Sequence, residues 1–221
     1  MSITRRSALR DVAAAVARAL DAAGISAVLT GGACATIYSS GRYQSRDLDF
    51  VIRSGGSRGS LDTAMASIGF RRDRDRYVHR QTPFFVEFPR GPLAIGDDIA
   101  VNPVDLKLGR GHVLALSPTD ACRDRLAAFY HWSDRQSLDV AVEIASANKV
   151  SMRTIARWSR TEDAIEKFEE FRRELGRRTA RQPANKLRGV AKNIEQIERG
   201  FGESKTVRGV RIVRRPAGAP V

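Results

Sequence analysis

The chain has 221 residues and a formal net charge of +13, from 38 lysine and arginine residues against 25 aspartate and glutamate residues. It contains no apolar run near the roughly 20 residues that a membrane-spanning helix needs, no signal-peptide core and only two lone cysteines, which indicate a reducing compartment. We therefore expect a cytoplasmic protein with no membrane partner, long enough for one α/β core and a smaller helical unit.

The first half of the chain alternates short segments of helical and strand-like pattern. Apolar residues at helical spacing follow Ser7, the expected N-cap, and end at Gly24. The segment from Pro89 to Pro103 has no regular pattern. We expect helices over residues 9–20, 33–39 and 61–68, and strands over residues 27–30, 47–53, 70–72, 77–80, 84–88 and 112–116.

The second half is helical in pattern. Ser117 is the expected N-cap of a helix with Pro118 at its first position, and Thr161 and Gly176 are the expected start and stop of a later helix. We expect helices over residues 118–130, 136–147, 151–158, 161–175 and 183–199. The sequence thus divides into a core at residues 1–116, a helical region at 117–200 and a disordered basic tail at 201–221.

The positive charge is concentrated near the C-terminus. Residues 1–150 carry 20 basic and 16 acidic side chains, a net +4, whereas residues 151–221 carry 18 and 9, a net +9. A polyanion such as RNA or DNA is the natural partner of such a region. The alternative is a basic surface that serves only solubility.

The segment from Val28 to Ile52 carries the clearest chemical signal. A short apolar strand runs into Gly31-Gly32, and a later strand carries Asp47 and Asp49, whose side chains share one face because strand side chains alternate. Two adjacent carboxylates repel each other unless a cation lies between them, and oxygen ligands suit Mg²⁺ or Mn²⁺. A Gly-Gly turn before a helix exposes N–H groups to a phosphate chain. Together these features indicate nucleotidyl transfer.

Gly31-Gly32 followed by Arg46-Asp47-Leu48-Asp49-Phe50 resembles the signature of the DNA polymerase β-like nucleotidyltransferase superfamily, most closely its AbiEii-type toxin branch. The resemblance implies an α/β (α+β) fold with a small mixed sheet as the nucleotidyltransferase core, flanking helices and a C-terminal basic helical region. It also implies that Asp47 and Asp49 hold the Mg²⁺ (or Mn²⁺) bound to a nucleoside triphosphate (NTP).

The superfamily needs a third carboxylate on a neighbouring strand, where it helps to hold a second metal ion. Glu87, within the aromatic run Phe84–Phe88, is the best candidate. The downstream acids Asp97, Asp98 and Asp105 remain alternatives. A non-catalytic reading also remains for the aspartate pair, with Asp47 capping a turn and Asp49 ion-paired to an arginine.

The segment around residues 123–136 resembles the helical motif that follows the catalytic sheet in AbiEii-like proteins. By that resemblance Arg123 or Arg125 binds the nucleotide phosphates and Asp134 supports them. Arg46 either contacts the phosphates or lies in solvent. The alternative for the whole segment is an amphipathic helix with a solvated basic face.

These features predict an enzyme that moves a nucleoside monophosphate (NMP) from an NTP to a hydroxyl group. RNA, in particular the 3′ end of tRNA, is the favoured acceptor, and family analogy suggests a toxin of a toxin–antitoxin or phage-defence system with an antitoxin partner. Two alternatives stay open. One is the same reaction on an aminoglycoside-like small molecule or a protein hydroxyl, and the other is a non-catalytic nucleic-acid-binding protein with this fold.

Overall fold

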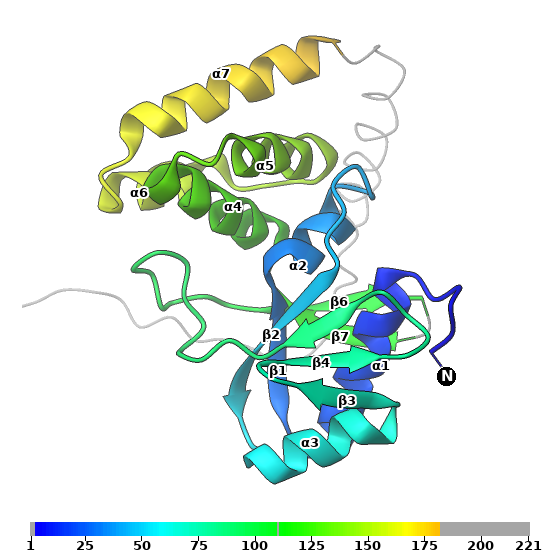
Figure 1. Cartoon of the computed structure of the whole chain (residues 1–221). Coiled ribbons are helices and arrows are strands. Elements are labelled where there is room, and N and C mark those ends of the chain that lie inside the picture. The colour runs from blue at the N-terminus through cyan, green and yellow to red at the C-terminus, as the bar shows by residue number, and fades with distance from the viewer. Residues whose placement is uncertain (1–2, 110, 182–221) are drawn as a thin grey trace, which may run out of the picture. The chain divides into compact units, whose positions relative to one another are not determined.

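The computed structural model describes residues 3–109 and 111–181, and it has a mixed α/β fold as expected (Figure 1). Seven strands form one mixed sheet in the order β3-β4-β5-β2-β1-β7-β6. The strands are β1 (Ser26–Thr30), β2 (Asp47–Ser54), β3 (Phe70–Asp73), β4 (Arg76–His79), β5 (Phe85–Glu87), β6 (Val104–Leu108) and β7 (Gly111–Ala115). The helix expected at 183–199 and the tail at 201–221 lie outside the described residues.

Strand β2 lies at the centre of this sheet. It pairs antiparallel with β1 on one side and parallel with β5 on the other. Strand β1 in turn runs parallel to β7, while β4 pairs antiparallel with β5. Strands β2 and β5 therefore run side by side in the same direction, which brings residues almost 40 positions apart in the sequence to the same height in the sheet.

Seven helices accompany the sheet in the described residues. They are α1 (Leu9–Ala22), α2 (Gly31–Tyr38), α3 (Arg58–Ser67), α4 (Pro118–Trp132), α5 (Arg135–Ala147), α6 (Met152–Thr161) and α7 (Ile165–Arg181). Helix α3 lies along β3 and contacts α1, whereas α2 contacts β2, α4 and α5 (Figure 1). Helix α2 thus links the sheet to the helices that follow it. None of the described helices is both long and apolar enough to cross a membrane.

The helices α4 to α7 pack through aromatic side chains. The rings of Tyr130 and Trp158 stack with centroids 5.3 Å apart, and the Tyr130 hydroxyl hydrogen-bonds to the Ser159 hydroxyl at 2.8 Å. Phe168 and Phe171 of α7 are buried in the same core. Contacts group the described residues up to Thr179 into one compact unit, so the sheet and these helices fold together.

Three local expectations are wrong. Ala8, not Ser7, is the N-cap of α1, because the Asp11 carboxylate accepts the Ala8 N–H bond at 2.9 Å and so replaces a serine cap. Thr161 is the last residue of α6, not a cap, and its hydroxyl donates to the Trp158 carbonyl. Helix α7 continues through Gly176 to Arg181, since a single glycine weakens a helix without ending it.

Strand β6 was not expected either. Its sequence, Val104–Leu108, contains an acid and a lysine, and most of its residues are exposed at the edge of the sheet, where polar side chains are common. The helix α4, in contrast, begins as expected, with Pro118 in its first turn and the Ser117 hydroxyl accepting the Asp120 N–H bond at 3.1 Å.

Candidate active site

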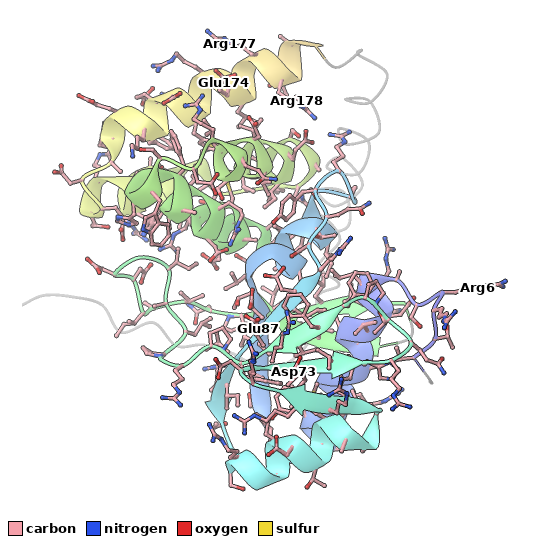
Figure 2. The ribbon with its side chains drawn as sticks, viewed as in Figure 1. Arg6, Asp73, Glu87, Glu174, Arg177 and Arg178 are labelled. Atoms are coloured by element: carbon pink, nitrogen blue, oxygen red, sulfur yellow. The ribbon has the colours of Figure 1, made fainter. Side chains whose placement is uncertain are left out.

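Three carboxylates lie together where β2 and β5 run side by side. Asp49 pairs with Glu87 in the parallel ladder, and Asp47 lies two residues before Asp49 on the same face (Figure 2 labels Glu87). The intervening Leu48 and the following Phe50 are fully buried, so the alternation along β2 sends the apolar side chains into the core. The structure thus brings the expected residues Asp47, Asp49 and Glu87 to one face of the sheet.

Burial and the neighbouring negative charges act together on the Asp49 carboxylate. Burial raises the pKa of Asp49 to about 7, and the negative charges of Asp47, Glu87 and Asp124 add to the effect, while Arg125 opposes it. An acid in this position is costly to ionise unless a cation accompanies it. The cluster therefore favours a bound cation.

The Gly31-Gly32 turn lies directly against this cluster. Helix α2 begins at Gly31, whose φ of +60° is in the left-handed region. A Cβ atom at Gly31 would overlap the Oδ2 atom of Asp49, and one at Gly32 would lie 2.6 Å from the Ser45 hydroxyl oxygen. Only glycine lets the backbone approach the carboxylate this closely. The N–H groups of the first turn of α2 therefore lie beside Asp49, one of the candidate metal ligands.

A chain of hydrogen bonds ties the glycine turn to Asp47. The Ser45 hydroxyl donates to the Asp47 carboxylate, and the Ser45 N–H group donates to the Thr36 hydroxyl at 2.9 Å. Thr36 in turn donates to the Gly32 carbonyl at 2.9 Å. No motif in the sequence points to Ser45, although its place two residues before Asp47 is a usable signal.

Of the two candidate arginines on α4, Arg125 is the one whose charge acts on Asp49. The Arg125 guanidinium donates to the Asp124 carboxylate at 2.6 and 3.0 Å, and its charge opposes the rise in the pKa of Asp49. Arg76, to which no sequence motif points, adds a second positive charge beside Glu87. It pairs with Glu87 across the antiparallel β4–β5 ladder, and its guanidinium lies 4.9 Å from the centre of the Phe85 ring.

Arg123 belongs to a different group of side chains. It is buried and ion-paired with Asp98 and, at 2.9 Å, with Asp120, and its guanidinium lies 5.0 Å from the centre of the Trp158 ring. Its Nε atom has no hydrogen-bond partner among the described residues. Hydrogen bonding by Arg123 holds the pKa of Asp98 below its usual range. The contacts of Arg123 are those of a structural cation.

Within residues 3–109 and 111–181, the remaining candidates form no side-chain hydrogen bond or ion pair with the three carboxylates of the cluster. Arg46 is exposed, and its carbonyl accepts the Phe85 N–H bond at 3.0 Å. Asp134 is the N-cap of α5 and accepts the Gln136 N–H bond at 3.0 Å.

Among the alternative acids, Asp98 pairs with Arg123, Asp105 pairs with His112 at 3.0 Å, and the Asp97 N–H group donates to Glu162. Glu87 is the acid that pairs with Asp49.

The donor set of the carboxylate cluster fits a divalent cation. All three side chains present oxygen atoms, which Mg²⁺ and Mn²⁺ prefer. In the described part of the chain no three histidine, cysteine or carboxylate side chains are close enough to form a ready-made metal site. Mutual repulsion keeps like charges apart, so the three side chains would have to draw together around the ion.

The Asp49 carboxylate should make the metal-free protein less stable as the pH rises. Folding raises the pKa of Asp49 from 3.8 to about 7, so the folded protein favours the protonated carboxyl group. The stabilising contribution of this group is complete below pH 3.8 and is lost as the pH rises through 7. An asparagine at this position does not ionise. We therefore expect the unfolding free energy of Asp49→Asn, relative to wild type, to increase by about 2 kcal/mol between pH 5 and pH 8.

Urea unfolding in a chelator, at both pH values, measures this difference. Asp73→Asn, on β3 and outside the cluster, is the control and should show no such change. A difference between Asp49→Asn and wild type that is the same at both pH values would contradict the raised pKa of Asp49.

Arg123 should matter for stability. Its removal leaves Asp98 and the buried Asp120 without their cation, so we expect Arg123→Met to lower the unfolding free energy by about 3 to 5 kcal/mol. The exposed neighbour Arg157 provides the control, and Arg157→Met should change stability by less than about 0.5 kcal/mol. An Arg123→Met protein as stable as wild type, but with a raised KM for NTP, would instead make Arg123 a phosphate ligand.

Comparison with known proteins gives distant structural similarity only. No protein-family model and no curated protein sequence matches the chain. An antigenic nucleotidyltransferase-like protein from Paracoccidioides brasiliensis has a similar structure, with 17% identity, a TM-score of 0.47 and coverage of 72% of this chain and 91% of that one. The antibiotic-resistance factor ANT(2'')-Ia is also similar, with 14% identity, a TM-score of 0.40 and coverage of 75% and 90%.

Proposed function

We propose that this protein is a metal-dependent nucleotidyltransferase that moves an NMP from an NTP to an acceptor hydroxyl and releases pyrophosphate. The observation that carries the proposal is the pairing of Asp49 with Glu87, with Asp47 on the same face and the Gly31 backbone in contact with the Asp49 carboxylate. Carboxylates on adjacent strands beside an open helix N-terminus combine a metal site with a phosphate site.

Each part of the site has a separate task in this reaction. Asp47, Asp49 and Glu87 would hold Mg²⁺ or Mn²⁺, which lowers the pKa of the acceptor hydroxyl and offsets the charge that develops on the leaving pyrophosphate. The N–H groups at the start of α2 and the Arg125 guanidinium bind phosphate oxygens. The Ser45 hydroxyl holds the Asp47 carboxylate in one orientation.

RNA is the acceptor that the charge distribution favours. Residues 151–221 carry a net charge of +9, which suits a polyanion and has little use in binding a small neutral acceptor. The 3′ end of tRNA provides the required free hydroxyl. By analogy with AbiEii-type proteins, we place the enzyme in a toxin–antitoxin or phage-defence system, with an antitoxin as its protein partner.

A second acceptor class has one observation in its favour. A cavity of about 730 Å³ lies between the loop at residues 97–102 and helices α4 and α6, and its lining includes Asp97, Asp120 and Glu162 as well as several hydroxyl groups. An acidic cavity with hydroxyl groups suits a cationic, polyhydroxylated small molecule such as an aminoglycoside.

Transfer of label from each α-³²P-labelled NTP to total bacterial tRNA, with Mg²⁺, tests the proposal. We expect label in RNA, with a KM for RNA that rises steeply between about 50 and 200 mM salt, because a polyanion releases counterions when it binds. Transfer of label to an aminoglycoside but not to RNA would show that the acceptor is a small molecule and would leave the proposed transfer reaction unchanged. A protein that binds neither NTP nor Mn²⁺ would overturn the enzymatic function.

A further inference from the structure

A second cavity lies on the opposite side of the sheet from the carboxylate cluster. Its volume is about 640 Å³, and the end of β2, the start of α3, strands β3 and β4 and the segment after β5 line it. Ile52 belongs to this lining and lies three residues after Asp49, so its side chain points to the other face of β2, about 10 Å along the strand. We call this cavity the arginine pocket.

The floor of the arginine pocket is apolar and aromatic. Ile52, Leu61, Tyr77 and Phe88 contribute to it. The Tyr77 and Phe88 rings meet edge to face, with centroids 5.5 Å apart and an angle of 90°. The Tyr77 hydroxyl is held by a 2.5 Å hydrogen bond to Asp62 of α3. The floor is therefore fixed in place by side chains of α3 and β4, as a preformed binding surface requires.

The rim of the arginine pocket is strongly basic. Arg58 of α3, Arg72 of β3 and Arg90 of the segment after β5 line it, against one acid, Asp75. All three arginines are exposed, and none forms an ion pair with a carboxylate among residues 3–109 and 111–181. Three guanidinium groups that converge on a cavity without paired acids create a concentrated positive potential there.

The N-terminus of α3 adds to this potential. The helix starts at Arg58, after the N-cap Ser57, and its first turn contains no acidic residue. Both Ser57 and Arg58 line the pocket. Unpaired N–H groups and the positive end of the helix dipole favour an anion at this position, in addition to the three side-chain charges.

We propose that the arginine pocket binds a nucleoside phosphate. The arginines and the start of α3 would hold the phosphate, because guanidinium groups bind its oxygens in pairs. The base and sugar would lie over the Phe88 and Ile52 side chains, since bases stack on aromatic surfaces. The cavity volume suits one such unit. The ligand is either one nucleotide of an RNA strand or a free mononucleotide.

This proposal goes beyond the transfer reaction, because binding in the arginine pocket requires neither the metal nor the carboxylate cluster. It can therefore be tested in a chelator, with catalysis switched off. The pocket variant is Arg58→Ala/Arg72→Ala/Arg90→Ala. The matched control, Arg80→Ala/Arg153→Ala/Arg173→Ala, removes the same charge from exposed positions that do not line the pocket.

Binding of a fluorescent single-stranded RNA decamer and of AMP, GMP, CMP and UMP, measured by anisotropy and calorimetry, gives the answer. We expect the pocket variant to weaken binding at least about tenfold, with a log–log salt dependence shallower by about 2, and the control to weaken it less than about threefold. A loss confined to RNA identifies an RNA strand as the ligand, and a loss for a mononucleotide identifies a free nucleotide.

Equal losses in the pocket and control variants would show an effect of net charge alone and overturn the proposal. Wild-type protein that binds none of these ligands would overturn it as well. Far-UV circular dichroism confirms that both variants fold, as expected for substitutions of exposed side chains. Failure of NMP transfer leaves this binding result unaffected, so the two proposals fail separately.

Discussion

Asp49→Asn is expected to reduce NMP transfer at least about a thousandfold. The substitution keeps the size of the side chain and removes the negative charge at the position beside Glu87 in the parallel ladder. Electrostatic stabilisation of the transferred phosphoryl group is the main contribution of such a site, so the loss of one charged metal ligand is felt almost entirely in kcat. Transfer from labelled NTP at saturating Mg²⁺ measures it.

Asp73→Asn is the control for this loss. Asp73 lies on β3, separated from β5 by β4, and its substitution should leave transfer within about twofold of wild type. The Asp49→Asn protein should also remain folded, and at pH 8 be more stable than wild type in a chelator. Transfer that survives Asp49→Asn at more than a tenth of the wild-type rate would exclude Asp49 as a metal ligand.

Gly31→Ala is expected to have the second largest effect, a loss of transfer of about a hundredfold or more. The φ of +60° at Gly31 disfavours any residue with a side chain, and the new Cβ atom would overlap the Asp49 carboxylate. Either the turn or the carboxylate must move. Both belong to the site, and a displacement of about 1 Å is enough to cost a hundredfold in rate.

Gly41 provides a matched control for this glycine. Its φ is +77°, but a Cβ atom at Gly41 would meet no atom within 4 Å. Gly41→Ala therefore introduces similar backbone strain without the overlap, and we expect each variant to lose about 1 to 3 kcal/mol of stability while only Gly31→Ala loses activity. Equal activity in the two variants would mean that the contact between Gly31 and Asp49 has no role in transfer.

The alternation along β2 is the part of the site that the sequence predicted best. Leu48 and Phe50 alternate with the two aspartates, and a period of two leaves only one arrangement of faces. Glu87 stands out in the sequence as an acid within an aromatic run. Its register beside Asp49 depends on the parallel pairing of β2 with β5, which local sequence does not determine.

The sequence alone does not distinguish between the two arginines of α4 as phosphate ligands. Arg123 and Arg125 are two residues apart on one helix, so they point in directions about 200° apart, and the sequence offers both as phosphate ligands. Helix packing separates them, because Arg123 lies on the buried stripe with Leu126 and Phe129. That stripe was visible in the sequence, whereas the partners Asp98 and Trp158 come from distant segments.

Binding of Mn²⁺, followed by electron paramagnetic resonance in the presence of NTP, tests most directly whether the carboxylate cluster holds a metal. We expect wild-type protein to bind Mn²⁺, Asp49→Asn to bind it at least about tenfold more weakly, and Asp73→Asn to match wild type. Equal binding by wild type and Asp49→Asn would contradict a metal site at Asp47, Asp49 and Glu87, and with it the proposed reaction.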